Sequence, residues 1–562
     1  MSAAGPPPAR ILETGFGAGL NFLADWQAWR QSGQPGLLHY AGITAQPVAP
    51  AALVQAAHDP ALQPLAQQLA AQWSGLTPGF HRMVFEEGRV LLTLCVGETR
   101  AMLRAQEFGA DAVRLHDVPA SPADWDLHAL KAIARLCRRG AVLAASQAHA
   151  GLRPHLASCG FTPHGAQGDA PEEWSAMFAP DWEPRGTQRG AREAGSCVVV
   201  GGGLAGAAAA NSLARRGWQV QVLDAAPFPA AGASGLPAGL LAPHQSPDDS
   251  LLSRLTRAGV RSTLQQAQAL LHEGSDWQAS GALEHRPDAL QSLPTAVAEA
   301  LAPWSREATA AEKQQAFLHA DAPALWHDRA AWIKPAALVR AWLDHPRIHW
   351  RGNSTVARLV ATPKGWQLLD ASGASLAQGE LVVVAAAHAS AALLPDLGGP
   401  PPVLQPVRGQ VSWAMAAAGL RLPPFPLHGN GHLLPRVPMD EGEAWLCGAS
   451  FGRDDTGLDA RDQDHAENLE RLRVLAPEAA QQLAPAFQNR EVQTWTQLRC
   501  VAADRRPLLG ELAPGLWLST AMGSRGLTFA MLCAELLAAR LHGEPLPLER
   551  KLADALDARR HR

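Results

Sequence analysis

No stretch of the 562-residue chain is both long enough and apolar enough to cross a membrane. The longest nearly apolar run, residues 381–394, contains a histidine and is shorter than the roughly 20 residues that a membrane-spanning helix requires. The first ten residues are rich in proline and lack the apolar segment of a secretory signal peptide. We therefore expect a cytoplasmic protein that does not act at a membrane.

Lysine is scarce, and the net charge is −4, so the chain has no overall basic character. This excludes nucleic-acid binding through a uniformly basic surface, and any such binding must use local arginine clusters. The seven cysteines include no Cys-x-x-Cys pair and no cysteine–histidine spacing of a zinc site. We expect buried free thiols and no bound metal.

The chain is too long for a single domain, because single hydrophobic cores rarely grow beyond about 250–300 residues. Its composition changes at residues 180–196, which are rich in proline, glycine and charge and show no apolar periodicity. We interpret residues 184–195 as a linker between an N-terminal half, 1–183, and a C-terminal half, 196–562. Each half begins with a glycine-rich loop.

The second glycine loop has the sequence context of a dinucleotide site. The segment "CVVV" (197–200) predicts a strand, and three glycines follow at G-x-G-x-x-G spacing: Gly201, Gly203 and Gly206. An alanine-rich helix and a second strand at 218–223 come next, and Asp224 then stands where an acid accepts hydrogen bonds from a ribose. The glycines would let the backbone approach a pyrophosphate, which a helix N-terminus attracts.

The C-terminal half resembles the flavin-dependent amine oxidases related to D-amino-acid, glycine and sarcosine oxidases. Besides the loop, the resemblance lies in three segments: "GASG" (232–235), "PVRGQV" (406–411) and "GSRGL" (523–527). It implies an α/β fold, in which a doubly wound FAD-binding domain carries an inserted α+β substrate domain at roughly 275–330 and 400–495. It also implies that FAD contacts four further residues: Ser234, Gly523, Arg525 and Gly526.

Two arginines are candidate catalytic residues of this half. By the same resemblance, Arg499 in "LRCVAADRRPLLG" (498–510) matches the arginine that binds the substrate carboxylate in glycine-oxidase-like enzymes. A guanidinium suits that role because it can form two parallel charge-assisted hydrogen bonds, and the alternative is a structural or surface arginine. Arg408 and Gln410 lie in a segment expected near the flavin, or else serve only as part of a strand entering the substrate domain.

The N-terminal loop "LETGFGAGLNFL" (12–23) resembles the methionine-binding loop of S-adenosylmethionine-dependent methyltransferases. The resemblance implies a Rossmann-like domain and a cofactor site that includes Glu13, Gly15, Gly17 and Gly19. The chain departs from that pattern at residues 38–53, where Thr44 stands in place of the glutamate that would hold the ribose. Glu98 is the candidate substitute for an aspartate near the adenine.

The segment that would lie beside the methyl acceptor is also altered. The stretch "RLHDVPASPADW" (114–125) is shorter than its counterpart in these methyltransferases. Asp117 is the candidate catalytic residue if the loop shifts by one position, and otherwise His116 takes its place. The sequence therefore leaves open both an active methyltransferase half and a degenerate one.

Together, the two halves resemble a family of bacterial bifunctional tRNA-modifying enzymes that make 5-methylaminomethyl-(2-thio)uridine at the wobble position. The resemblance covers nearly the whole chain. It implies that the flavin half removes the carboxymethyl group of 5-carboxymethylaminomethyl-(2-thio)uridine as glyoxylate, and that the other half then methylates the exposed amine. The partner would be tRNA, with candidate phosphate contacts at Arg138, Arg139, the linker arginines Arg185, Arg189 and Arg192, Arg505, Arg506 and residues 558–562.

Two other functions stay open at this point. One is a FAD-dependent oxidase of a small amine or a D-amino acid with a non-catalytic N-terminal domain, although such an oxidase needs no methyltransferase-like partner. The other is a tRNA-binding protein that has lost catalysis, against which the intact second loop argues. The eighteen tryptophans could stack on a flipped base, but the sequence does not say which aromatic side chains are exposed.

Overall fold

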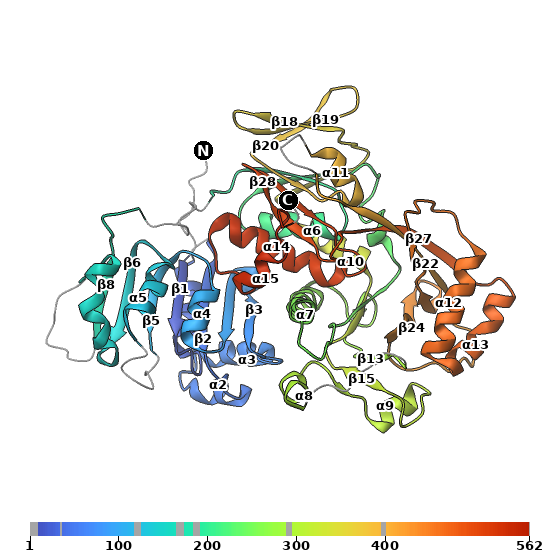
Figure 1. Cartoon of the computed structure of the whole chain (residues 1–562), viewed down its shortest axis with the longest axis horizontal. Coiled ribbons are helices and arrows are strands. Elements are labelled where there is room, and N and C mark those ends of the chain that lie inside the picture. The colour runs from blue at the N-terminus through green and yellow to red at the C-terminus, as the bar shows by residue number, and fades with distance from the viewer. Residues whose placement is uncertain are drawn as a thin grey trace. The chain divides into compact units, whose positions relative to one another are not determined.

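The computed structural model describes residues 9–33, 36–116, 125–163, 173–183, 192–287, 295–394 and 401–560. The chain forms two compact units, which Figure 1 colours by residue number. The first unit comprises Met1–Glu193 and Glu535–Ala555, and the second comprises Ala194–Ala534 and Leu556–Arg562. A segment near the C-terminus thus belongs to the same unit as the N-terminal half, and the composition break at 180–196 gives no sign of this.

The first unit is built on an eight-stranded sheet in the order β3-β4-β2-β1-β5-β6-β8-β7. The pairs from β4 to β6 are parallel, and the pairs at both edges are antiparallel. The strands are β1 (Ala9–Thr14), β2 (Leu38–Thr44), β3 (Gly79–Phe85), β4 (Val90–Val96), β5 (Ala110–Leu115), β6 (Cys137–Ser146), β7 (Phe161–Pro163) and β8 (Glu173–Phe178). Strands β2 and β4 are buried along their whole length, as expected for a parallel sheet covered on both faces.

Helices cover both faces of this sheet. Neighbouring residues of β1 point to opposite sides, so Leu12 and Ile11 belong to different hydrophobic clusters. Three helices contribute to the Ile11 cluster: α1 (Leu20–Ser32), α2 (Pro50–Ala56) and α3 (Gln63–Gln72). Two others contribute to the Leu12 cluster: α4 (Thr99–Ala105) and α5 (Leu127–Ala134).

The C-terminal segment of the first unit is held by hydrogen bonds to the N-terminal half. The carbonyl oxygen of Gly543 accepts from the amide of Gly109 at 3.2 Å, and the amide of Leu546 donates to Oε1 of Gln106 at 2.9 Å. This segment starts within α14 (Gly526–His542), at Glu535, and includes α15 (Arg550–Asp554). It links residues more than 400 positions apart in the sequence.

The second unit contains a six-stranded sheet in the order β17-β10-β9-β21-β29-β28, parallel except at β28. Its strands are β9 (Ser196–Val200), β10 (Gln219–Leu223), β17 (Ile348–Arg351), β21 (Leu381–Val384), β28 (Leu508–Ala513) and β29 (Leu516–Thr520). Helix α6 (Leu204–Ala214) packs on this sheet through buried alanines, whose small side chains allow close approach. A hydrophobic cluster joins the sheet to the meander β18 (Arg358–Thr362), β19 (Gly365–Leu369) and β20 (Ser375–Gly379).

A nine-stranded sheet forms the rest of the second unit, in the order β14-β15-β13-β23-β24-β25-β22-β26 with β27 paired to β22. Its strands are β13 (Ala282–His285), β14 (Arg306–Glu307), β15 (Ala324–His327), β22 (Gln405–Met415), β23 (Leu427–Gly429), β24 (Gly431–Met439), β25 (Gly442–Gly448), β26 (Gly452–Arg453) and β27 (Gln493–Val501). Helices α12 (Asp462–Leu475) and α13 (Pro477–Gln488) share its hydrophobic cluster.

The remaining elements complete the second unit. A three-stranded sheet packs with helices α7 (Leu251–Leu270) and α10 (Pro335–Leu343), and its strands are β11 (Gly239–Leu241), β12 (Trp277–Gln278) and β16 (Ala331–Ile333). Three short helices are α8 (Thr295–Leu301), α9 (Ala310–Gln315) and α11 (Ser390–Leu393). All seven cysteines are free and buried, as expected. Within the described ranges, no helix has the length and apolarity that a membrane span requires.

Candidate active sites

The second glycine loop connects β9 to α6, and its geometry requires glycine. Gly201 has a φ of 110°, which side chains rarely allow. A Cβ atom on Gly206 would lie 1.9 Å from the carbonyl oxygen of Gly201, so the backbone of the glycine loop and that of the first turn of α6 are in direct contact. The loop therefore ends at the N-terminus of a helix, which is the arrangement that binds a pyrophosphate.

Two side chains fix the position of this loop. The Asp224 carboxylate, directly after β10, accepts hydrogen bonds from the amides of Gly202 at 2.6 Å and Ala226 at 2.8 Å. The Ser234 hydroxyl accepts from the amide of Leu204, the first residue of α6, at 2.9 Å. Both carboxylate oxygens keep a further lone pair, so Asp224 can still accept from a ribose hydroxyl.

One cavity of about 1120 Å³ contains both the glycine loop and Arg499. Seven of the predicted site residues line it: Gly201, Gly203, Asp224, Ser234, Arg499, Gly523 and Gly526. The backbone cradle at Gly206, the ribose-facing acid and the volume fit a bound FAD with room beside it for a small part of a substrate. Arg525 does not line this cavity.

Arg499 presents a guanidinium without an acidic partner among the described residues. It lies on β27, which pairs with β22. A Cβ atom on Gly409 of β22 would lie 2.2 Å from Nη2 of Arg499, so the absence of a side chain at Gly409 makes room for the guanidinium. Nη1 donates to the carbonyl oxygen of Ser450 at 3.3 Å. Burial, with Arg471 nearby, lowers the Arg499 pKa to about 10, so the side chain stays charged at neutral pH. An unpaired cation in a cavity favours an anionic ligand.

Arg408 has a different position from the one expected. It precedes Gly409 on β22, so its side chain leaves the opposite face of the strand, and it does not line the cavity. Its buried guanidinium forms an ion pair with Asp464 and donates to the carbonyl oxygens of Gly457 at 2.7 Å and Asp459 at 2.6 Å. We therefore correct its assignment from catalytic to structural: it anchors the segment before α12.

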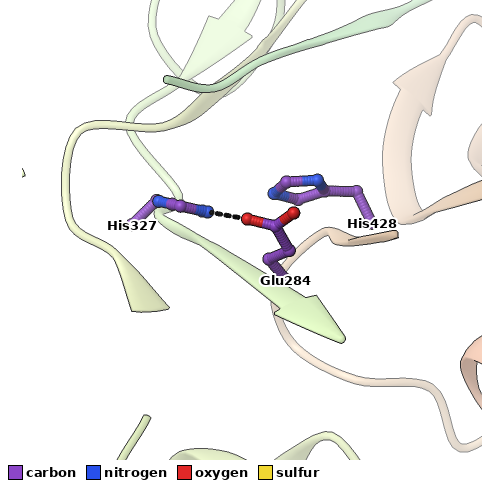
Figure 2. Close-up of side chains that lie close together, drawn as sticks. All are labelled: Glu284, His327 and His428. Carbon is purple, nitrogen blue, oxygen red and sulfur yellow. Dashed lines mark hydrogen bonds and ion pairs between the residues drawn. The ribbon is translucent and has the colours of Figure 1, made fainter. Parts of the chain in front are cut away.

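Figure 2 shows a polar cluster on three strands, in which Glu284 and His327 are buried and His428 is half-buried. No sequence spacing indicated it. Glu284 accepts from His327 Nε2 at 3.0 Å, and His428 lies beside them, all ligand atoms within 4.8 Å of one another. Burial opposes ionisation of Glu284, but the bond from His327 and nearby cationic groups hold its pKa at about 2. Because Arg286 also pairs with Glu284 at 2.7 Å, the carboxylate charge is already balanced, and we interpret the cluster as a link between strands.

The first glycine loop follows β1 and surrounds Glu13. Its three glycines all have positive φ, between 54° and 72°: Gly15, Gly17 and Gly19. The buried Glu13 carboxylate accepts from Asn21 Nδ2 at 2.6 Å and from the Tyr40 hydroxyl at 2.7 Å. His116 Nε2 lies 3.8 Å from it, at the end of the neighbouring strand β5. The loop thus has the left-handed turns that glycine permits, and the cofactor roles of Glu13 and the three glycines stay predictions.

The stability of the first unit should depend on Glu13 and pH. Burial raises the Glu13 pKa to about 7, although hydrogen bonds from Asn21 and Tyr40 oppose the shift. The folded chain therefore keeps a proton that the unfolded chain releases near pH 4.5. The contribution of this proton to the free energy of unfolding is fully present below that pH and is lost as the pH rises through about 7. The loss is at most about 3 kcal/mol. Thermal unfolding across this range should show a shallower pH dependence in Glu13→Gln, and an equal slope in both proteins would contradict this assignment.

Two residues of the first unit that the sequence singled out form hydrogen bonds with the protein backbone. Glu98 is the N-cap of α4, where its carboxylate accepts from the amides of Arg100 and Ala101, so a role at the adenine would compete with the cap. Thr44, at the end of β2, donates to the carbonyl oxygen of Gln46 at 3.0 Å. Asp117, the candidate catalytic residue, lies outside the described residues.

Several candidate phosphate contacts are already paired with acids. Asp504 binds both Arg506, at 2.6 Å, and Arg560, in the second unit near the end of the chain, at 2.8 Å. Arg138 pairs with Asp111 at 3.0 Å.

Sequence reasoning missed two cavity residues, His432 and Phe451. Burial and the nearby Arg499 lower the pKa of His432 to about 4. Neither belongs to a recognisable motif, and only the folded sheet brings them to the cavity.

Comparisons with known proteins agree with both halves of this description. Residues 196–540 match a family described as FAD dependent oxidoreductase, and residues 60–170 match one described as S-adenosyl-L-methionine-dependent methyltransferase. Among solved structures, glycine oxidase from Geobacillus kaustophilus has a TM-score of 0.51 at 19% identity, covering 65% of this chain and 98% of its own. At that identity the likeness shows the fold of the second unit alone.

Two curated relatives match almost the whole chain. A protein of Polaromonas sp. is 51% identical, covering 98% of this chain and 91% of its own, and one of Polaromonas naphthalenivorans is 50% identical, covering 98% and 90%. Both are named tRNA 5-methylaminomethyl-2-thiouridine biosynthesis bifunctional protein MnmC.

Proposed function

Because this chain belongs to the family of bifunctional tRNA 5-methylaminomethyl-2-thiouridine biosynthesis proteins, we propose that it modifies the wobble uridine of tRNA in two steps. The second unit acts as an FAD-dependent oxidoreductase, and the first as an S-adenosylmethionine-dependent methyltransferase. The observation that carries the oxidative step is the single cavity that contains both the dinucleotide loop and the unpaired Arg499.

The first step converts 5-carboxymethylaminomethyl-(2-thio)uridine into the 5-aminomethyl derivative. When bound, FAD supplies the two-electron oxidant. Arg499 binds the substrate carboxylate and so orients the adjacent CH2 group. The C–H and N–H bonds lose two electrons and two protons, which leaves a C=N bond. Water adds to this imine, and the C–N bond breaks to give glyoxylate and the primary amine.

The protein groups around Arg499 keep its charge available for this step. At neutral pH the guanidinium is ionised, whereas the neighbouring His432 imidazole is neutral because its pKa is lowered to about 4. The substrate carboxylate therefore meets one cation and no competing anion among the described cavity residues near Arg499.

The second step transfers a methyl group to the new amine. When bound, S-adenosylmethionine supplies the methyl group at the loop formed by Gly15, Gly17 and Gly19. The amine nitrogen forms the new N–CH3 bond as the S–CH3 bond of the donor breaks, and the nitrogen loses a proton. The Thr44 hydroxyl offers one weaker contact where a carboxylate would accept two ribose hydroxyls, so we expect weak cofactor binding rather than an inactive domain.

The test is incubation of the purified full chain with tRNA carrying 5-carboxymethylaminomethyluridine, with and without S-adenosylmethionine, followed by mass spectrometry of the nucleosides. We expect 5-aminomethyluridine without the methyl donor and 5-methylaminomethyluridine with it. The aminomethyl product under both conditions would show that this chain does not carry out the methyltransferase step. Unchanged nucleoside from a folded, flavin-loaded preparation would refute the tRNA reaction and favour an oxidase of small amines.

A further inference from the structure

Phe451 is an exposed aromatic side chain at the cavity that contains Arg499. Among the large apolar side chains exposed in the described part of the chain, only Phe451, 48% exposed, and Leu458, 50% exposed, also line the cavity. Every other exposed residue of this kind lies away from it. The exposed Phe451 ring at the cavity therefore offers a flat apolar face that a ligand can cover.

Two guanidinium groups lie near the Phe451 ring. The Cζ atoms of Arg499 and Arg453 each lie 5.9 Å from the ring centroid, at the outer limit of a cation–π contact. Arg499 lines the cavity, whereas Arg453, at the end of β26, is exposed and does not. Arg453 forms no ion pair with any described acid. One cation thus lines the cavity and the other is exposed at the surface, and both lie near the Phe451 ring.

A nucleotide with a carboxylate-bearing arm on its base has a group to match each of these side chains. These groups are the carboxylate, the flat pyrimidine and the phosphate of the chain. Bases extruded from RNA stack on aromatic side chains, and arginines neutralise the adjoining phosphates. We propose that Phe451 is the stacking platform for the uracil base whose arm Arg499 holds, and that Arg453 contacts a neighbouring phosphate. This inference rests on the proposed function.

The test compares Phe451→Ala with the aromatic variants Phe451→Tyr and Phe451→Trp. With the modified tRNA, Phe451→Ala should lower kcat/KM by about 5- to 150-fold, mainly through KM, and weaken equilibrium tRNA binding by a similar factor. The aromatic variants should restore most of both. Oxidation of N-methylglycine, which has no base, should fall by less than oxidation of the tRNA, because only the tRNA loses a stacking contact; if turnover of N-methylglycine is too slow to measure, the aromatic rescue decides alone. Phe228→Ala is the matched control, because Phe228 is 60% exposed and does not line the cavity.

Three results would overturn the stacking role: unchanged tRNA kinetics in Phe451→Ala, aromatic variants as impaired as alanine, or equal losses with tRNA and N-methylglycine. If the wild-type protein does not oxidise the modified tRNA, the proposed function fails and this inference fails with it. If the wild type does and Phe451→Ala behaves identically, only this inference fails.

The phosphate contact has its own readout. Arg453→Gln should weaken tRNA binding and lower the slope of log affinity against log salt by about 0.7, the value for one contact to single-stranded RNA. An unchanged slope would show that Arg453 does not contact a phosphate of the tRNA.

Discussion

Replacing Arg499 by glutamine should lower kcat/KM for oxidation of the modified tRNA by about 10²- to 10³-fold. The change removes both charge-assisted hydrogen bonds to the carboxylate, and with them the orientation of the reacting CH2 group. FAD content and methylation of a 5-aminomethyl tRNA should stay at wild-type levels, since the substitution leaves both glycine loops unchanged and the methyl-transfer step belongs to the other unit. Initial rates of nucleoside conversion, measured by mass spectrometry, check this.

Two further variants separate the clamp from a general charge effect. Arg499→Lys keeps the charge but cannot form two parallel bonds, so its rate should lie between those of wild type and Arg499→Gln. Arg436→Gln removes an exposed arginine that pairs with Glu443 at 2.9 Å, and should change little. Wild-type rates in Arg499→Gln would rule out the carboxylate clamp.

Replacing Gly206 by alanine should give a protein that is purified largely without FAD. The new methyl group would lie 1.9 Å from the Gly201 carbonyl oxygen, and only a backbone shift can relieve that overlap. Such overpacking costs about 1–3 kcal/mol, and a displaced loop no longer aims its amides at a pyrophosphate. We expect at least about a tenfold loss of FAD affinity, measured by titration of the apoprotein, since 1.4 kcal/mol corresponds to a factor of ten.

Gly232→Ala is the matched control for this variant. Gly232 lines the same cavity, but a Cβ there would meet nothing within 4 Å. It should therefore bind FAD as the wild type does. Equal FAD affinity in Gly206→Ala and Gly232→Ala would show that the close approach at Gly206 is not needed for the cofactor.

The sequence predicted local structure most successfully where a motif consists of residues close together in the chain. The loops at Gly15–Gly19 and Gly201–Gly206 could be found because a tight turn before a helix needs glycine at fixed spacing. Strand β9 and helix α6 follow from the same segment, since β-branched residues and then small helix-forming residues occur in that order.

Side-chain direction was harder to predict than the presence of a motif. Arg408 and Arg499 both lie in segments that resemble flavoenzyme motifs, yet only Arg499 lines the cavity. The difference comes from strand alternation: Gly409 faces Arg499, so the preceding residue must point the other way. Glu98 likewise stands near the expected position, but the start of α4 uses its carboxylate as a cap.

By itself, the sequence determined that this chain has two nucleotide-type loops, two units and an arginine in a flavoenzyme motif, because those features depend on local spacing. Tertiary structure alone decided which distant residues meet. It grouped residues 535–555 with the N-terminal half, brought Glu284, His327 and His428 together from three strands, and placed the Phe451 ring near both Arg453 and Arg499. The physical reason is that such contacts arise from sheet pairing and burial across hundreds of residues, and neither leaves a fixed spacing in the sequence.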